Sequence, residues 1–168
     1  VGLIGIYTMD VFGVGYETIE RALHSEMTTM FMIALLVAKV LATSLTLGSG
    51  GSGGVFAPSL FMGAVLGGGF GNFVHGWMPT LTAVPGAYAL VGMAAVFAGA
   101  ARAPITAIII LFEMTQDYRI ILPLMLSTVI STMVSARLRR ESIYTLKLMR
   151  RGVEIRPRRS QNLMRSIQ

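Results

Sequence analysis

The sequence predicts an all-α, polytopic membrane protein with broken and tilted helices. Of its 168 residues, 54% are hydrophobic and only 13% are charged, whereas a typical soluble domain has about 25% charged residues. One long stretch, residues 40–101, contains no Asp, Glu, Lys or Arg. Two apolar runs reach the length of about 20 residues that a helix needs to cross a hydrocarbon core about 30 Å thick. A water-soluble surface is not compatible with this distribution.

Five apolar runs predict the helices. The first covers residues 27–47 and contains one charged residue, Lys39, and the second covers residues 55–78. Three later runs are shorter and cover residues 88–101, 104–112 and 120–136. Lipid offers no hydrogen-bond partner to an interrupted backbone, so such breaks are tolerated only where they are buried in protein or face a water-filled pathway. We therefore expect about six helical segments, some of them stopping within the membrane, around a pathway.

Glycine, proline and charged residues separate the runs and end the helices. The breaks are expected at residues 48–54, 79–86, 102–104 and 116–119. Within the second run, Gly63, Gly67 and Gly71 recur every four residues, so they share one helix face and allow another backbone to approach closely. Small residues also recur farther along the chain, at Gly92, Ala95, Gly99 and Ala103. This pattern predicts tight packing between helices.

Positive charge is concentrated at the C-terminal end. Residues 137–168 contain ten of the 14 Lys and Arg residues but two of the eight acidic residues. The basic segment directly follows an apolar helix, and its one aromatic residue is Tyr144. These features favour a collar at the membrane surface over a nucleic-acid-binding segment. By the positive-inside rule, we expect the C-terminus to be cytoplasmic.

The residue types present give no basis for an enzyme or a metalloprotein. The sequence contains no cysteine, which excludes disulfides, thiolate metal sites and a cysteine nucleophile. His24 and His75 have no companion residues at the spacing of metal ligands, so we expect no metal and no cofactor. No nucleophile, base and orienting acid come together in the pattern, and catalysis is therefore not expected.

The most informative segment is the glycine-rich run at residues 48–58. Its last residues, which lead into the second apolar run, are Gly53, Gly54, Val55, Phe56, Ala57 and Pro58. Glycine lets the backbone turn sharply, and proline suits the first turn of a helix. A helix is therefore expected to begin at membrane depth, where its first N–H groups lack intrahelical acceptors and its dipole places partial positive charge. Such a helix start is an anion site.

This segment has three other interpretations. In one, Ser52 caps the helix and the glycines serve only close packing; the residues alone support this interpretation equally well. A Walker phosphate-binding loop is excluded because no Lys-Ser or Lys-Thr pair follows the glycines. A Rossmann loop is excluded because no strand precedes the glycines and no acidic residue follows at the required distance.

Residues 54–58, Gly-Val-Phe-Ala-Pro, resemble the GxFxP motif of the CLC family of chloride channels and proton-coupled chloride transporters. Further segments resemble sequences of the family and occur in the same order as in the family. They lie at residues 47–71, 92–104, 111–115 and 142–144. The resemblance implies that residues 1–151 form the C-terminal, inverted-repeat half of a CLC membrane domain. Residues 152–168 would form a basic cytoplasmic linker toward CBS domains that this chain does not contain. The serine donor and the gating and proton-transfer glutamates of the family belong to the N-terminal half, which lies outside this chain.

The resemblance implies transport of chloride, or a similar monovalent anion, across the lipid bilayer. The backbone amides of Val55 and Phe56 would bind the dehydrated chloride, and the Tyr144 hydroxyl would be the second donor from this half. Partial charges of this kind replace the hydration shell and still release the ion, as conduction requires. The resemblance is compatible with both a passive channel and a proton-coupled antiporter. The alternative is a membrane scaffold without transport activity, in which the glycines serve helix packing only.

The resemblance also implies a homodimer, with the apolar face of residues 120–126 and 108–111 between the subunits. Contact of this face with lipid is the alternative. Lys39 either attracts anions or extends toward the headgroup region, and the sequence does not decide between the two. Glu113 lies close to a helix end, and we expect a structural role for it, with Arg102 as a conceivable partner.

Overall fold

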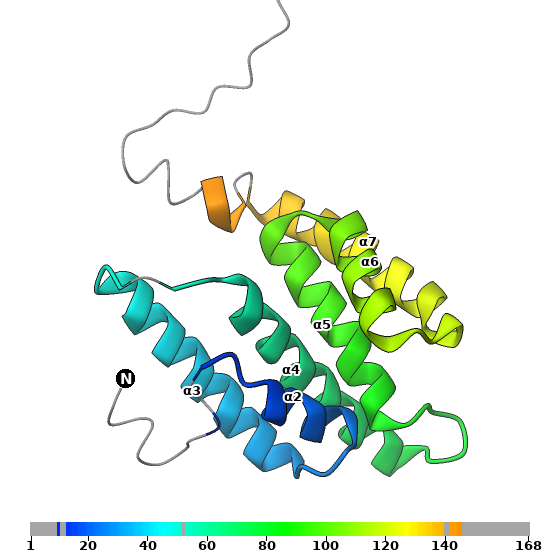
Figure 1. The fold of residues 1–168 in the computed structure, drawn as a ribbon. Helices are drawn as coiled ribbons and strands as arrows, with labels where there is room; N and C mark the ends of the chain where they lie inside the picture. The colour runs from blue at the N-terminus through cyan, green and yellow to red at the C-terminus, as the bar shows by residue number, and fades with distance from the viewer. Residues whose placement is uncertain (1–9, 11–12, 52, 140–141, 146–168) are drawn as a thin grey trace, which may run out of the picture.

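The computed structural model describes residues 10, 13–51, 53–139 and 142–145. Within this part of the chain, α4 lies at the centre, between α3 on one side and α5 on the other (Figure 1). α6 and α7 pack against α5, and the short α2 packs against α4 and α5. The elements are α2 (Tyr16–Leu23), α3 (Thr29–Gly48), α4 (Phe56–Trp77), α5 (Pro85–Ala101), α6 (Pro104–Thr115), the 3-10 helix η2 (Tyr118–Ile120) and α7 (Ile121–Leu138).

The helix breaks lie where the sequence predicts them. Proline is the first residue of both α5 and α6, a position where its missing N–H removes no intrahelical hydrogen bond. α5 and α6 end at Arg102 and Gln116, whose φ angles of 56° and 51° place them in the left-handed region. Only a few non-glycine residues adopt this conformation, and it reverses the chain direction at a helix end. The interrupted helices that the sequence predicts are therefore confirmed.

α2 is an α-helix that the apolar runs did not predict. It is 8 residues long and has a polar outer face, so it has no long apolar run. Its inner face consists of Thr18, Ile19 and Ala22, which are buried. Their spacing of one, three and four residues is the helical periodicity that identifies such a short amphipathic helix.

The lengths of the helices are those expected of a membrane domain that has interrupted helices. α3, α4 and the stretch Tyr118–Thr145, which includes residues outside the described ranges, are long and apolar enough to cross a membrane. α5 and α6 are apolar but shorter, with 17 and 12 residues, and at 1.5 Å per residue the shorter one covers about 18 Å. We therefore infer that α6 stops within the hydrocarbon layer, as the sequence predicts for the later runs.

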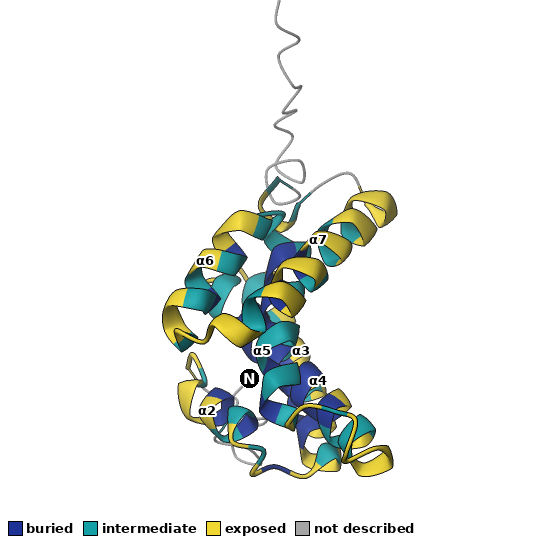
Figure 2. Ribbon diagram, turned by 90° about the vertical axis from the view of Figure 1, so that its right-hand side faces the viewer, coloured by how far each residue is buried: buried dark blue, intermediate teal, exposed yellow. Residues whose placement is uncertain are grey.

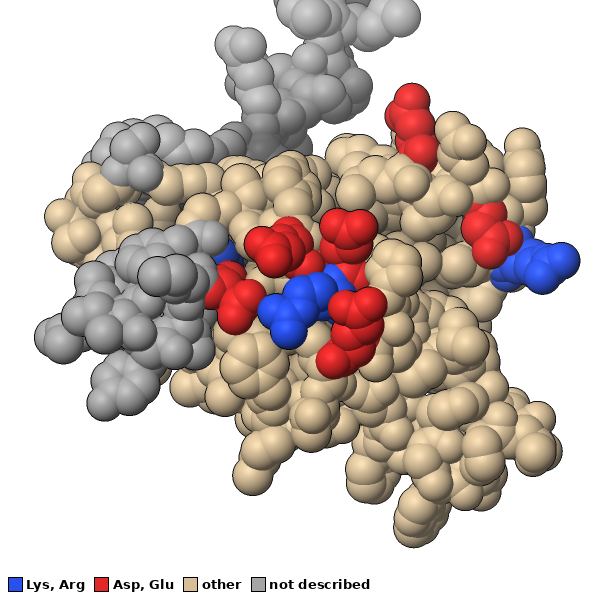
Figure 3. Space-filling view, turned by 60° about the horizontal axis from the view of Figure 1, so that its bottom comes forward, with Lys and Arg blue, Asp and Glu red and all other residues tan. Residues whose placement is uncertain are grey.

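The surface is largely apolar on the outer helices. Figure 2 shows buried residues concentrated in the central helices and exposed residues along α6 and α7. On the face drawn in Figure 3, most of the charged side chains gather in a central group, a further acidic and basic pair lies at one edge, and one acidic side chain stands alone at the top; the residues between them are uncharged. Exposed apolar surface of this extent is unusual in a soluble monomer and is typical of contact with lipid or other protein helices.

α4 and α5 pack backbone to backbone through the predicted glycine face. A Cβ atom on Gly63 would lie 2.5 Å from the carbonyl oxygen of Gly92, and a Cβ on Gly71 would lie 2.9 Å from the Cα of Pro85. A Cβ on Gly67 would meet the Tyr88 carbonyl group. Residue numbers rise along α4 as they fall along α5, so the two helices are antiparallel. The predicted close approach is confirmed.

α7 is attached to α5 by two hydrogen bonds from serine hydroxyls. Ser131 Oγ donates to the Ala95 carbonyl at 2.6 Å, and Ser135 Oγ donates to the Gly99 carbonyl at 2.6 Å. A Cβ on Gly99 would lie 2.6 Å from Ser131 Oγ, so the glycine provides the space in which this hydroxyl lies. Hydroxyl-to-carbonyl bonds between helices contribute about 0.6 kcal/mol on average in membranes and at most about 1.7 kcal/mol.

Replacing Ser131 and Ser135 together with alanine should therefore lower the stability of the protein in detergent by about 1–3 kcal/mol. The measurement is the Tm of the purified protein, followed by intrinsic fluorescence. Ser127→Ala is the matched control, because the Ser127 hydroxyl donates to Leu124 within α7 itself. An equal change of Tm in the control would contradict a specific role for the bonds to α5.

Arg102 connects the ends of two helices. Its backbone N–H donates to the Ala98 carbonyl at 2.8 Å, and its guanidinium donates to the carbonyl of Arg139, the residue that ends α7. A cation is favourable at this position because helix C-termini have partial negative charge. Glu113 is exposed and forms no ion pair with Arg102, so the partnership that the sequence allowed is not adopted.

Candidate anion site at the start of α4

The first turn of α4 leaves backbone N–H groups without intrahelical partners. The first backbone bond of the helix joins the Ser59 N–H to the Val55 carbonyl at 3.1 Å. The N–H groups of Val55, Phe56 and Ala57 precede this bond, and Pro58 has none. Within the described ranges, none of these N–H groups donates to another residue. Val55 is the N-cap residue, and its apolar side chain cannot accept a hydrogen bond. Three donors and the positive end of the helix dipole therefore lie together.

The Phe56 side chain, in the first turn of α4, packs against α5. The ring of Phe56 packs edge-to-face against the ring of Phe97, with 4.9 Å between the centroids. The Ser59 hydroxyl is buried and donates to the Phe56 carbonyl at 2.6 Å, so it is not used as a cap for the N–H groups. These contacts fix the direction of the first turn while its N–H groups keep their donor capacity.

The glycines before α4 have two different roles. Gly50 has a φ of +82°, and the Gly51 N–H donates to the Thr46 carbonyl at 3.0 Å, so this pair closes the end of α3. A Cβ on Gly51 would lie 2.8 Å from the same carbonyl oxygen. A Cβ on Gly54 would meet no atom within 4 Å, and the nearest atom to a Cβ on Gly53 would be in the Leu47 side chain at 3.6 Å. Close packing therefore explains why residue 51 is a glycine. It does not explain the glycine at residue 54, because Gly54 borders open space. Ser52, the alternative cap, lies outside the described residues.

Tyr144, the predicted second donor, lies in a short helical turn after α7. The Ser142 N–H donates to Thr145 Oγ1 at 2.8 Å, and the Thr145 N–H donates to Ser142 Oγ at 3.4 Å. The Tyr144 side chain is 52% exposed. It makes no hydrogen bond or ring contact with another residue of the described part, so its phenol is available. Its pairing with Val55 and Phe56 stays a prediction.

A family model described as voltage gated chloride channel matches residues 1–136 of the chain. The chain belongs to the voltage-gated chloride channel family. It is 39% identical over 150 residues to a ClcB-like protein of Ralstonia nicotianae, and 37% identical over 149 residues to the H(+)/Cl(-) exchange transporter ClcA of Vibrio campbellii. The expected resemblance is confirmed by these matches, each of which covers 89% of the chain.

Known structures support the same assignment. The crystal structure of a slow cyanobacterial Cl-/H+ antiporter matches 79% of the chain with a TM-score of 0.73 and 32% sequence identity. The match confirms the all-α fold of a voltage-gated chloride channel family member. The chain spans about a third of its relatives, 35% of the Ralstonia protein, 32% of the Vibrio protein and 31% of the antiporter chain.

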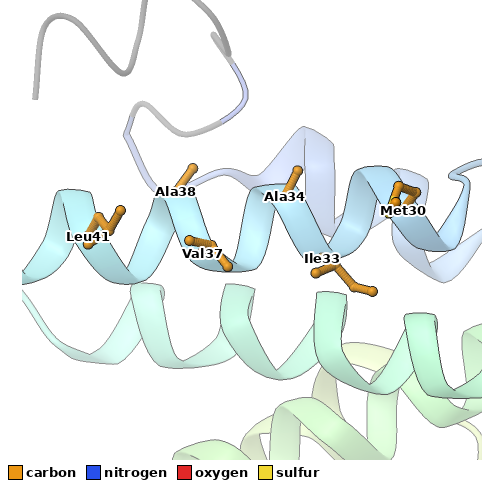
Figure 4. Close-up of a pocket in the computed structure, with 6 residues that line it drawn as sticks. All are labelled: Met30, Ile33, Ala34, Val37, Ala38 and Leu41. Atoms are coloured by element: carbon orange, nitrogen blue, oxygen red, sulfur yellow. The ribbon is translucent and has the colours of Figure 1, made fainter.

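One groove among the described residues is lined by none of residues 48–58. It has a volume of about 490 Å³ and runs along α3 (Figure 4). It is lined by Met30, Ile33, Ala34, Val37, Ala38 and Leu41. These residues recur at helical spacing on one face, and all are apolar. They offer no donor to an anion, and the groove is therefore a packing surface for lipid or another helix.

Phe97 is the residue near the candidate site that the sequence did not identify. It is buried on α5, and its ring contacts Phe56 on α4. An aromatic residue within an apolar run has no distinguishing signal, because phenylalanine fills many helix faces. The contact depends on the antiparallel packing of α4 against α5.

Proposed function

We propose that this chain forms part of a pathway that moves chloride, or a similar monovalent anion, across a lipid bilayer. The observation that carries the proposal is the start of α4, where the Val55, Phe56 and Ala57 N–H groups have no partner among the described residues. Uncharged donors at a helix start attract an anion and still release it, unlike a full ammonium in direct contact. The family relationship supports the same function.

Proton-coupled exchange is the form of transport that we propose. The Vibrio relative is named an H(+)/Cl(-) exchange transporter, and the matching crystal structure is of a Cl-/H+ antiporter. A scaffold in which the glycines serve packing only is less well supported, because a side chain on Gly54 would contact nothing. Within the pathway, the Val55 and Phe56 amides and the Tyr144 hydroxyl would be the ligands from this chain.

We further propose a homodimer and a cytoplasmic C-terminus. Ile109, Leu122 and Leu126 are exposed on α6 and α7, which supports an apolar subunit contact there. Leu111, which the sequence placed on this face, is instead fully buried, so the dimer surface would consist of outward-facing residues only. The basic residues 137–168 support the cytoplasmic orientation. We also propose that the full-length protein has cytoplasmic CBS domains after this basic segment.

The proposal is tested by anion flux from liposomes that contain the full-length protein. Wild-type protein should release chloride under a chloride gradient and should move protons in the opposite direction. Tyr144→Phe removes the hydroxyl and keeps the ring, so it should weaken chloride binding by about 10- to 100-fold, the loss of one hydrogen bond to a charged ion. Absence of flux in wild-type liposomes would support the scaffold instead. Tyr118→Phe, on η2, is the matched control.

A further inference from the structure

Lys39 is a buried lysine in the middle of a membrane-spanning helix. α3 covers Thr29–Gly48, so Lys39 is about two and a half turns from either end. Its side chain is only 3% exposed. Extension toward the headgroup region, one of the two roles that the sequence allowed, is therefore not adopted. An ionisable residue that faces the interior of a membrane bundle is costly and points to a function.

Two groups beside Lys39 Nζ interact favourably with an ammonium. Its Nζ donates to the Gly13 carbonyl at 3.0 Å and lies 4.6 Å from the centroid of the Phe61 ring. Carbonyl oxygens and the faces of aromatic rings both attract a cation. Phe61 is fully buried on α4, and a Cβ on Gly15 would lie 2.5 Å from its ring. The ammonium is therefore held in place between the segment before α2 and the first turns of α4.

The position of Phe61 relates this ammonium to the candidate anion site. Phe61 follows Phe56 by five residues on α4, which is about 7.5 Å along a helix axis. With the further distance from the ring to Nζ, the charge lies on the order of 10 Å from the N–H groups at the start of α4. This distance is too long for direct contact with the anion. It is short enough for an electrostatic effect through the protein, where the effective dielectric constant is near 20.

We propose that Lys39 supplies a buried positive charge that strengthens anion binding at the start of α4 without contacting the anion. This proposal rests on the proposed function. At about 10 Å and an effective dielectric constant near 20, a unit charge changes the affinity of an anion by roughly tenfold. The N–H groups coordinate the ion, and Lys39 makes the electrostatic potential at their position more positive. Because the ammonium is not a ligand, it does not hinder release of the ion as a direct contact would.

The test is chloride binding to the full-length protein in detergent, measured by isothermal titration calorimetry. Lys39→Gln removes the charge and keeps an N–H donor for the Gly13 carbonyl, and Lys39→Met removes both. Lys39→Arg keeps the charge, and Phe61→Leu removes the ring contact but leaves the lysine. The Kd for chloride should rise by about tenfold in the two neutral variants. It should stay within about threefold of wild type in the Lys39→Arg and Phe61→Leu variants.

Three results would overturn the proposal. The first is a wild-type Kd in Lys39→Gln, since the charge would then have no effect on the anion. The second is an equal loss of affinity in Phe61→Leu, since local packing would then explain the change. The third is loss of a monodisperse elution profile in both neutral variants but not in Lys39→Arg. The charge would then be needed for the stability of the fold and not for anion binding. Absence of chloride binding in wild-type protein would instead contradict the proposed function itself.

Discussion

Replacing Gly67 with valine should strongly destabilise the native membrane domain. A Cβ on Gly67 would lie 3.0 Å from the carbonyl carbon of Tyr88 and 3.1 Å from the Cα of Ala89, which are backbone atoms of α5. Backbone atoms cannot move aside as a flexible side chain can, so α4 and α5 would have to separate. Overpacking of a well-packed interior costs about 1–3 kcal/mol, and loss of the whole helix contact adds to this.

Size-exclusion chromatography and thermal unfolding in detergent measure this effect. We expect Gly67→Val to give little monodisperse protein and a Tm lower than wild type by at least about 10 °C. Gly76→Val is the matched control, since it lies on the same helix and a Cβ there would meet no atom within 4 Å. Native elution and an unchanged Tm for Gly67→Val would show that the described packing of α4 on α5 is wrong.

Replacing Val55 with proline should reduce chloride transport strongly while the fold is retained. Proline lacks the N–H that we assign to the anion, and it is tolerated at the start of a helix. The φ of Val55 is −97°, within about 30° of the proline value. The preceding residue, Gly54, is the residue type with the greatest conformational freedom. Loss of one hydrogen bond to a charged group costs about 1.5–3 kcal/mol, which corresponds to roughly 10- to 100-fold in transport at limiting chloride.

Chloride efflux from liposomes is the measurement for Val55→Pro, with Val55→Ala as the control that shortens the side chain and keeps the N–H. Both variants should elute as wild type does. Transport by Val55→Ala should stay within about threefold of wild type, because the N–H group is unchanged. Wild-type transport by Val55→Pro would exclude this amide as a ligand and would leave Phe56 and Ala57 as the candidate donors.

The interruptions of the helices could be predicted because their causes are local. Pro85 and Pro104 begin helices, and the glycines at residues 50 and 51 close the end of α3. Each of these effects depends on the residue's own backbone freedom or on its missing N–H, which is a property of the residue type. The open N–H groups at the start of α4 follow in the same way, because every helix start has them.

The directions of side chains could not be predicted in this way. Lys39 lies within an apolar run that has residues suited to burial on every side, so the run itself does not show which face meets α4. The contact of Phe56 with Phe97 and the exposure of Glu113 are further cases. Each depends on how one helix is rotated against another, and no neighbour in the sequence determines that rotation.

The sequence alone was enough to predict a membrane-embedded all-α chain whose helices end at Gly, Pro and charged residues. It also predicted the glycine face of α4 and the unpaired N–H groups at the start of that helix. The tertiary structure decided which backbone the glycines meet, where Lys39 points and which glycine borders open space. The physical reason is the range of the forces. Backbone geometry and hydrophobic length act over a few neighbouring residues, whereas close packing and buried charge depend on groups that only the folded chain brings together.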